Sequence, residues 1–383
     1  MNLKLKDIVP QLITVIAVVL IFGFFTYNAQ INMENRGIDF GYGFLSQEAS
    51  FDVQFSLIEY DGSHSYFRAY LVGLLNTILV SVIGIIIATI LGIIVGIARL
   101  SSNYLINKFA AFYVEFFRNI PLLLQLFFWY FAALRTLPLP QDAESTFGVF
   151  FLTIKGLYVP AFVWENLNVF FYSVVATFIS IVFVRTYARK VQENQGKQIP
   201  VLLISIGLIF IFPLLSFIFG GVSLSFEVPK LKQLATTSFV YDGGLSLPPE
   251  LIALTLALSL YTATFIAECV RAGVQGVGKG QKEAAASIGL TPNQVLKLVV
   301  MPQALRIIIP PTTNQYLNLT KNSSLAAAIA YPDIVLVFAG TALMQTGKAI
   351  EIVSITMFTY LSLSISISIL MNWYNKKIAI QEK

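Results

Sequence analysis

Long apolar runs alternate with short polar segments along almost the whole chain. A helix that crosses a bilayer needs about 20 mostly apolar residues, and eight windows come close to that length. They are Val9–Tyr27, Leu71–Ala98, Phe109–Leu134, Val169–Val184, Val201–Phe219, Leu251–Ala267, Pro311–Ala330 and Ile352–Tyr374. The seventh window is the most polar. The pattern predicts an all-α integral membrane protein with about eight transmembrane helices.

Composition supports the same class of protein. Hydrophobic residues make up 56% of the 383 positions and charged residues only 12%, which is more apolar surface than a soluble domain can bury. The first span follows Lys4 and Lys6, as the apolar part of a secretory signal would. No small-x-small cleavage site comes after it, because Tyr27 occupies a position where a small residue is wanted. We therefore expect an uncleaved amino-terminal anchor.

Charged residues predict the orientation of the spans. With the amino terminus inside, the inner loops hold roughly twice as many Lys and Arg residues as the outer segments, which is the bias of cytoplasmic loops. Both termini are then cytoplasmic. The net charge of +5 is interpreted as a sign of topology and of contact with anionic lipid, and not of nucleic-acid binding.

Few residues offer catalytic or metal chemistry. With one cysteine, Cys269, and one histidine, His64, the chain has little from which to build a disulfide, a thiolate cluster or a Ser/His/Asp triad. A phosphate-cradling Gly-x-x-x-x-Gly-Lys-Ser/Thr motif is also missing from the sequence. We expect a protein that is not an enzyme, with no catalytic residue, no metal site and no cofactor of its own. A partner must supply any driving energy.

Four parts are expected along the chain. Residues 1–69 form the anchor helix and an irregular outer segment, and residues 70–136 begin the core. Residues 137–247 are an insertion of two spans joined by the basic loop 185–197. Because an insertion of two spans leaves the membrane on the side where it entered, it does not change the orientation of later spans. Residues 248–383 complete the core and carry its cytoplasmic loop.

That cytoplasmic loop, between Glu268 and Pro302, begins with signals for a short helix. Its alanines favour a helix over residues 282–287, and Gly289 suits the left-handed position just past a helix end.

A second short helix is expected directly after this glycine. Thr291 fits its N-cap, Pro292 its first position and Gln294 the capping box, and Pro302 ends the helix or marks its exit. A compact unit of two helices with an alanine face can dock into a groove on a cytoplasmic partner. The alternative is an amphipathic loop that lies on the bilayer surface.

The same loop resembles a family motif. Glu283-Ala284-Ala285, Gly289 and Val299-Val300-Met301-Pro302 are similar to the EAA loop of ABC-transporter permeases, with Val299 and Met301 in place of the commoner Ile and Leu. Segments such as Lys279-Gly280-Gln281 and Leu319-Thr320-Lys321-Asn322-Ser323-Ser324 resemble the polar amino-acid permeases. The resemblance covers roughly residues 66–136 and 248–375, and is greatest for the larger permease subunit of general L-amino-acid importers.

This resemblance implies a five-helix core of the type I ABC importer permeases in a bacterial inner membrane. It implies an ATP-binding-cassette ATPase dimer that uses ATP and Mg, a second permease that is different or identical, and a periplasmic amino-acid-binding protein. The resemblance further implies a set of residues that couple the permease to the ATPase. They are Lys282, Glu283, Ala284, Ala285, Gly289, Thr291 and Pro302.

The polar seventh span supplies a hypothesis for the substrate pathway. Asn314, Asn318 and Lys321 fall at i, i+4 and i+7, on one helical face, and polar groups at membrane depth need water or partners. A helix that starts at Pro311 places Lys321 near mid-membrane, whereas a start at Pro302 places it nearly outside. As a structural alternative, Lys321 is only a tie at the outer interface. The full candidate set is Asn314, Asn318, Lys321, Ser323, Ser324, Arg118 and Glu268.

Arg118 and Glu268 each have a simpler interpretation. Arg118, which precedes the helix-kinking Pro121, can be a packing or lipid-contact charge, and Glu268 can pair with Arg271 at i+3. The expected mechanism is alternating access, driven by the partner ATPase through the cytoplasmic loop. A passive polar-solute channel and a permease for another small solute remain as alternative functions.

Overall fold

The computed structural model describes residues 5–35, 40–235 and 238–378. The chain divides into two compact units, Met1–Leu126 with Leu254–Lys383, and Phe127–Ala253. The predicted class is confirmed, since the described chain is mostly helical. Within these described ranges, seven helices are long and apolar enough to cross a membrane, and one bent helix pair makes up to eight.

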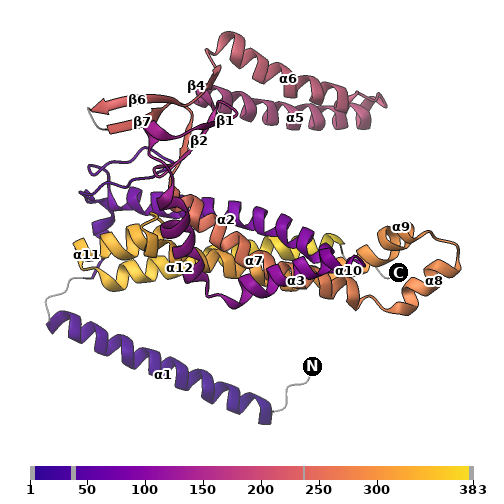
Figure 1. Ribbon diagram of the computed structural model, residues 1–383, viewed down its shortest axis with the longest axis horizontal. Coiled ribbons are helices and arrows are strands. Elements are labelled where there is room, and N and C mark those ends of the chain that lie inside the picture. The colour runs from indigo at the N-terminus through magenta and orange to yellow at the C-terminus, as the bar shows by residue number, and fades with distance from the viewer. Residues whose placement is uncertain (1–4, 36–39, 236–237, 379–383) are drawn as a thin grey trace. The chain divides into compact units, whose positions relative to one another are not determined.

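The first unit holds most of the helices drawn in Figure 1, with α7 beginning five residues before the boundary between the units. Its regular elements are α1 (Leu5–Asn35), η1 (Tyr42–Ser46), α2 (Tyr66–Ala98), α3 (Tyr104–Asn119), α4 (Leu122–Phe127), α7 (Pro249–Gly276), α8 (Lys279–Ser287), α9 (Pro292–Gln294), η5 (Val295–Val300), α10 (Met301–Asn322), η6 (Ser323–Ile329), η7 (Val335–Ala342), α11 (Leu343–Thr346) and α12 (Ala349–Ile378).

Helices α2 and α7 pack along a seam of glycines. A Cβ atom added to Gly92 would lie 2.6 Å from Cβ of Ile266, and one added to Gly96 would lie 2.7 Å from Cβ of Val270. Neither position has room for a side chain, so the two backbones approach as closely as small residues allow in membrane helices. The seam fixes α7, which leads directly into the cytoplasmic loop.

The third predicted span, Phe109–Leu134, is wrong as a single straight helix. The chain bends by 101° between Tyr104–Asn119 and Leu122–Thr136. The bend follows from Pro121, because a proline disfavours helical dihedrals at the residue before it, and Ile120 is extended with φ −94° and ψ 129°. The side-chain amide of Gln125 donates to the carbonyl oxygens of Phe117 and Ile120, which satisfies acceptors that the bend frees.

The seventh predicted span begins earlier than Pro311. Helix α10 starts at Met301 and follows the π-helical turn η5 without a break, so the prediction that Pro302 ends the second short helix is wrong. The wider turn of η5 lets Pro302 occupy the first turn of α10, where its missing N–H costs nothing.

The outer segment 40–65 forms an ordered cover on the outer end of the first unit. It contains one short 3-10 helix, η1, and one isolated bridge between Glu48 and Ser65, so it is largely irregular, as expected. Phe44 stacks on Phe338 at 6.3 Å between ring centroids, and the side chain of Asn76 donates to the carbonyl oxygen of Phe55. These contacts fix the outer end of α2 against η7.

The second unit contains eight short strands that the sequence analysis did not predict. They form one sheet in the order β1-β2-β3-β8 and two ribbons, β4·β5 and β6·β7. The elements are η2 (Phe128–Ala133), η3 (Leu134–Thr136), η4 (Pro140–Asp142), β1 (Ser145–Thr146), β2 (Phe150–Thr153), β3 (Gly156–Val159), β4 (Ala161–Glu165), α5 (Leu167–Gln195), α6 (Val201–Phe219), β5 (Ser223–Glu227), β6 (Lys230–Ala235), β7 (Ser238–Asp242) and β8 (Leu245–Leu247).

Candidate coupling segment and polar helix face

Residues 279–302, within the loop that was expected to be cytoplasmic, fold as the predicted pair of short helices and are called the coupling segment below. After α8, the N–H of Gly289 donates to the carbonyl oxygen of Ala286 at 3.0 Å, and the N–H of Leu290 donates to that of Ala285 at 3.3 Å. This pair of bonds is a Schellman motif. Gly289 has φ +84°, a value that strains other L-residues, so the glycine is required for the turn.

The start of the second short helix also agrees with the prediction. The backbone N–H of Thr291 donates to Oε1 of Gln294 at 2.9 Å, and Pro292 occupies the first turn of α9. The Gln294 arm of a capping box is therefore present. The left-handed glycine ends α8, and the capping box begins α9 two residues later. Because these two signals are so close together, they fix the angle between α8 and α9.

Within the coupling segment, some of the predicted residues lie on an exposed face and others on a buried face. Glu283, Ala284 and Gly289 are exposed, whereas Ala285 is buried. Ile288 is 78% exposed, which is unusual for an isoleucine in contact with water. The exposed face of the segment thus consists of small residues with the apolar side chain of Ile288 beside them. An exposed surface of this kind is suited to insertion into a groove on a partner.

The coupling segment is tied to the core through α7 and α10. Nζ of Lys282 donates to the carbonyl oxygen of Val274 at 3.5 Å. A side chain at Gly273 would collide with Ile308 and with the carbonyl oxygen of Ala304. Helix α8 is therefore bonded to the end of α7, and α7 packs closely on α10 one residue earlier in the chain.

Glu268 is the centre of an ion-pair network at the inner end of α7. Its Oε2 accepts from Nε of Arg271 at 2.7 Å, as the i, i+3 spacing predicted, and its Oε1 accepts from Nη1 of Arg99 at the end of α2. Arg271 also donates from Nη1 to Gln275 at 2.6 Å. Both carboxylate oxygens are engaged, and the Glu268 side chain is 24% exposed. Sequence reasoning missed Arg99, whose only signal is its position just past an apolar span.

The polar face of α10 is exposed in this chain. Asn314, Asn318 and Lys321 are all exposed, whereas Ser323 is buried and donates from Oγ to the carbonyl oxygen of Thr320 at 2.7 Å. The three exposed residues therefore share one face as predicted by their spacing.

Several polar side chains of α10 are turned back onto the helix or onto α2. Ser324 donates to the carbonyl oxygen of Lys321 at 2.8 Å, and Tyr316 forms a hydrogen bond with Thr89 of α2, also at 2.8 Å. Because α10 starts at Met301, Lys321 lies about 30 Å along the helix at 1.5 Å per residue. This length corresponds to the earlier of the two predicted starts and to the outer end of the span.

Arg118 stands apart from the polar face in its contacts. Its guanidinium carbon lies 5.1 Å from the ring centroid of Phe265 in α7, which is a cation–π contact. Arg118 is in the last turn of α3, where a positive charge is favourable beside helix carbonyl groups. In this structure Arg118 packs against Phe265.

A buried carboxylate that the sequence analysis did not select lies at the outer end of the core. Asp333 is fully buried, and its Oδ1 accepts from the N–H of Leu336 at 2.9 Å. The neighbouring N–H of Ile334 donates to Oγ1 of Thr77 at 3.0 Å. These bonds cap η7 and hold it on α2, so Asp333 has a structural function.

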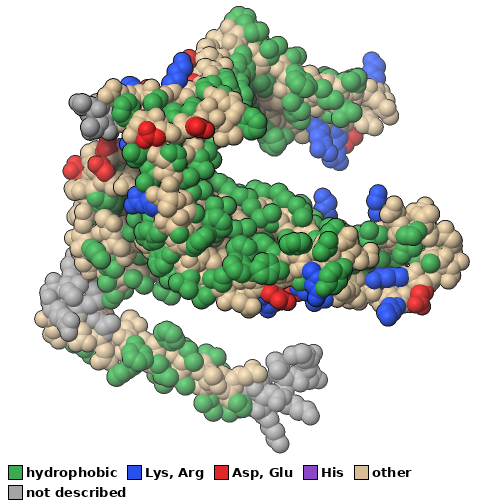
Figure 2. Space-filling view, viewed as in Figure 1, with side chains coloured by type: hydrophobic (Ala, Val, Ile, Leu, Met, Phe, Trp, Pro, Cys, Tyr) green, Lys and Arg blue, Asp and Glu red, His purple; other side chains and the backbone are tan. Residues whose placement is uncertain are grey.

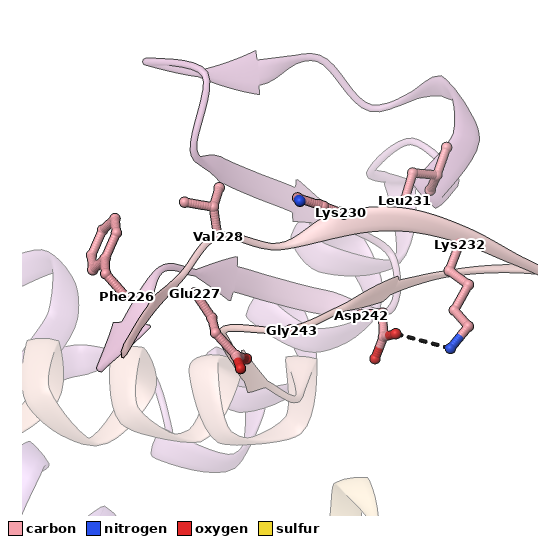
Figure 3. Close-up of a pocket in the computed structure, with 8 residues that line it drawn as sticks. All are labelled: Phe226, Glu227, Val228, Lys230, Leu231, Lys232, Asp242 and Gly243. Carbon is pink, nitrogen blue, oxygen red and sulfur yellow. Dashed lines mark hydrogen bonds and ion pairs between the residues drawn. The ribbon is translucent and has the colours of Figure 1, made fainter. Parts of the chain in front are cut away.

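A cavity in the second unit lies on its strands and holds none of the predicted site residues. Figure 3 shows Lys232 of β6 paired with Asp242 of β7, with Nζ and Oδ2 2.9 Å apart, beside Lys230 and Glu227. The charged groups here are exposed and of both signs. Within the described ranges, no group of three His, Cys, Asp or Glu residues is placed to hold a metal ion.

Comparison with known proteins identifies the relatives of the chain. Residues 196–380 match the family described as "Binding-protein-dependent transport system inner membrane component". The "Putative amino-acid ABC transporter permease protein YhdX" of Escherichia coli K12 is 48% identical over 374 residues, which cover 97% of this chain and 94% of that protein.

Two further relatives match along nearly the whole length. The "General L-amino acid transport system permease protein AapQ" of Rhizobium johnstonii is 46% identical, covering 99% of this chain and 94% of that protein. The "Glutamate/glutamine/aspartate/asparagine transport system permease protein BztB" of Rhodobacter capsulatus is 39% identical, covering 93% and 89%. The chain is therefore a multi-pass membrane permease that belongs to the family of binding-protein-dependent transport system inner membrane components.

Proposed function

We propose that this chain is the transmembrane permease subunit of an ATP-binding-cassette importer that moves L-amino acids from periplasm to cytoplasm. The coupling segment carries the proposal, because its exposed small-residue face, left-handed glycine and capped helix start build a rigid element for a cytoplasmic partner. The names of three relatives, each an amino-acid permease, support the substrate class.

The proposal includes several partners. An ATPase dimer that uses ATP and Mg binds the coupling segment, a second permease subunit completes the pathway, and a periplasmic binding protein delivers the amino acid. The chain lies in the bacterial inner membrane with both termini cytoplasmic, an orientation supported by the excess of Lys and Arg in the inner loops.

The proposed mechanism is alternating access. Closure of the ATPase dimer pushes on α8 and α9, and the bond from Lys282 to Val274 passes the displacement to α7. Glu268 holds α7 to α2 through Arg99, so the inner ends of these helices move together. The exposed face with Asn314, Asn318 and Lys321 lines the pathway, where the Lys321 ammonium attracts the substrate carboxylate at its outer end.

A passive channel is the alternative from another class, and the names of the relatives do not favour it. Co-purification from native membranes separates the two functions. The importer predicts that an ATPase subunit purifies with the chain and that uptake into vesicles requires ATP. Uptake by the purified chain alone would contradict the importer.

Gly289 tests the coupling segment. Gly289→Arg places a long side chain on the exposed face and forces a left-handed arginine, at a cost of about 1–2 kcal/mol, although an added Cβ has no neighbour within 4 Å. The variant should remain in the membrane but retain less ATPase. Gly289→Asn is the matched control, since asparagine tolerates the left-handed region. Normal transport by Gly289→Arg would remove the coupling role from this loop.

Lys321 tests the pathway. Lys321→Met keeps the length of the side chain and removes its charge, so the uptake rate should fall most for substrates that depend on carboxylate attraction. Lys348→Met, at another outer position just before α12, is the control for loss of one outer charge. Wild-type uptake of every amino acid by Lys321→Met would leave Lys321 as a structural tie.

A further inference from the structure

Within the second unit, the helices α5 and α6 are covered mainly by each other. The two helices lie side by side (Figure 1), and their buried side chains are Thr177, Ala188 and Ser216. Residues 167–184 and 201–219 contain no charged side chain. These runs are about 27 Å long at 1.5 Å per residue, close to the roughly 30 Å of a hydrocarbon core. The pair thus has the length and the apolar surface of two membrane spans.

All charges of the pair lie where the two apolar runs join. Between residues 185 and 197 there are four basic residues and one acid, which leaves three net positive charges. All five side chains are exposed, and Figure 2 shows Lys and Arg side chains gathered at that end of the pair. The basic residues are Arg185, Arg189, Lys190 and Lys197, called the basic end below.

The basic end has little counter-charge within the protein. Arg189 pairs with Glu193 at 2.9 Å, but both side chains are exposed, by 81% and 61%, and such pairs are weak. Arg185, Lys190 and Lys197 have no ion pair or hydrogen bond with any described part of the chain. These three exposed cations are paired with no acid among the described residues of the second unit, so they are free to bind anions from outside the protein.

Some basic residues at other helix ends, in contrast, have partners within their own unit. Arg99 and Arg271 share the carboxylate of Glu268, and Lys377 lies 5.4 Å from the ring centroid of Trp373. The positive bias of inner loops explains why all these residues are on one side of the membrane. It does not explain why the cations of the basic end are left without partners.

We propose that the basic end is a binding site for anionic phospholipid headgroups and anchors the α5–α6 pair. Arg185 is the first residue after the apolar run, which places it at headgroup depth, and Arg189 follows at i+4 on the same helical face. Two guanidinium groups on one face bind phosphate oxygens in bidentate fashion. Lys197, in the turn before α6, supplies a cation from the other side of the pair.

The test measures which lipids stay with the protein. The full-length chain, purified with its native partners, is placed in nanodiscs made from equal amounts of phosphatidylcholine and phosphatidylglycerol, and then partly stripped with mild detergent. Mass spectrometry of the retained lipid should show phosphatidylglycerol enriched severalfold over phosphatidylcholine. Added salt should reduce that enrichment, because it screens exposed charges. Equal retention of both lipids by the wild-type protein would overturn the proposal.

Two variants locate the site. Gln at all four basic positions should return the retained lipid to the bulk ratio, whereas Lys376→Gln with Lys377→Gln, which removes cations from the end of α12, should keep most of the enrichment. Enrichment that survives in the fourfold variant, or is lost equally in the control, would overturn the site.

The fourfold variant could insert with the wrong orientation, because it lacks the positive charges of the turn. A second variant with fewer substitutions is therefore used if that happens. Insertion is checked with Gln198→Cys, which a membrane-impermeant thiol reagent should not reach from outside once Cys269 is replaced by Ser. If the turn is labelled from outside, Arg189→Gln with Lys190→Gln decides, since Arg185 and Lys197 then keep the turn inside. Unchanged lipid enrichment in that double variant would overturn the proposal.

Discussion

Helix α7 of the first unit and the pair α5–α6 of the second unit all have the length and hydropathy of membrane spans, with α7 the least apolar, but each is packed differently within its own unit. Within its most apolar window, 67% of α7 is buried in the protein, against 6% for α5 and for α6. Hydropathy and length alone identify all three helices as membrane spans. Within its unit, α7 packs on α2, where glycines allow a close approach, whereas α5 and α6 are covered mainly by each other.

Glycine neighbours show the contrast most directly. In α2, any side chain at Gly92 would collide with Ile266, while in α6 the nearest atom to an added Cβ at Gly207 is 4.0 Å away, on Ile211 of the same helix. The α2–α7 interface therefore depends on the absence of a side chain at Gly92, whereas Gly207 of α6 has room for one.

The largest expected effect comes from the same substitution at these two glycines. Gly92→Ala should destabilise the protein by about 1–3 kcal/mol, as overpacked sites do, and lower its melting temperature in detergent. Gly207→Ala should leave the melting temperature unchanged or raise it, since alanine is favoured over glycine in a helix interior by about 0.5–1 kcal/mol. Equal effects at the two sites would break the comparison.

A smaller effect is expected from the two glutamates of the ion pairs. Glu268→Gln leaves the guanidinium groups of Arg99 and Arg271 without a carboxylate at sites that are 19% and 31% exposed. The cost should be about 1–2 kcal/mol, below that of a fully buried pair. Glu193→Gln, in an exposed pair with Arg189, should cost about 0.5 kcal/mol or less. Thermal unfolding of both variants sharpens the contrast between core and insertion.

The smallest effect concerns two asparagines that precede helices. The side chain of Asn103 accepts from two backbone N–H groups at the start of α3, so Asn103→Ala should cost about 1 kcal/mol. Asn166, before α5, caps no N–H and has φ +55°. Asn166→Gly should stay within about 0.5 kcal/mol of wild type, because glycine adopts this conformation freely. A larger loss at Asn166 would mean that the insertion is more tightly built than its burial indicates.

Local features of the sequence predicted local features of the structure. The spacing of Gly289, Thr291 and Gln294 predicted both turns of the coupling segment, because each signal acts within one helical turn. The i, i+3 pair of Glu268 with Arg271 was visible for the same reason.

Features that depend on distant residues were not predicted. The salt bridge from Glu268 to Arg99 joins residues 169 positions apart, and β3 pairs with β8 through Leu157 and Leu247. Short strands of this kind have no periodicity of their own and are defined by their partners. The sequence left two starts open for α10, at Pro302 and at Pro311, and the helix begins at Met301, next to the earlier one.

The ribbon β4·β5 has a consequence for how this chain can change. Ala161 and Glu227 are direct cross-strand partners, so the polypeptide that enters the α5–α6 pair and the polypeptide that leaves it run next to each other, about 5 Å apart. A tight turn can bridge such a gap. If such a turn replaced the helix pair, the chain would lose two crossings and every downstream helix would keep its direction.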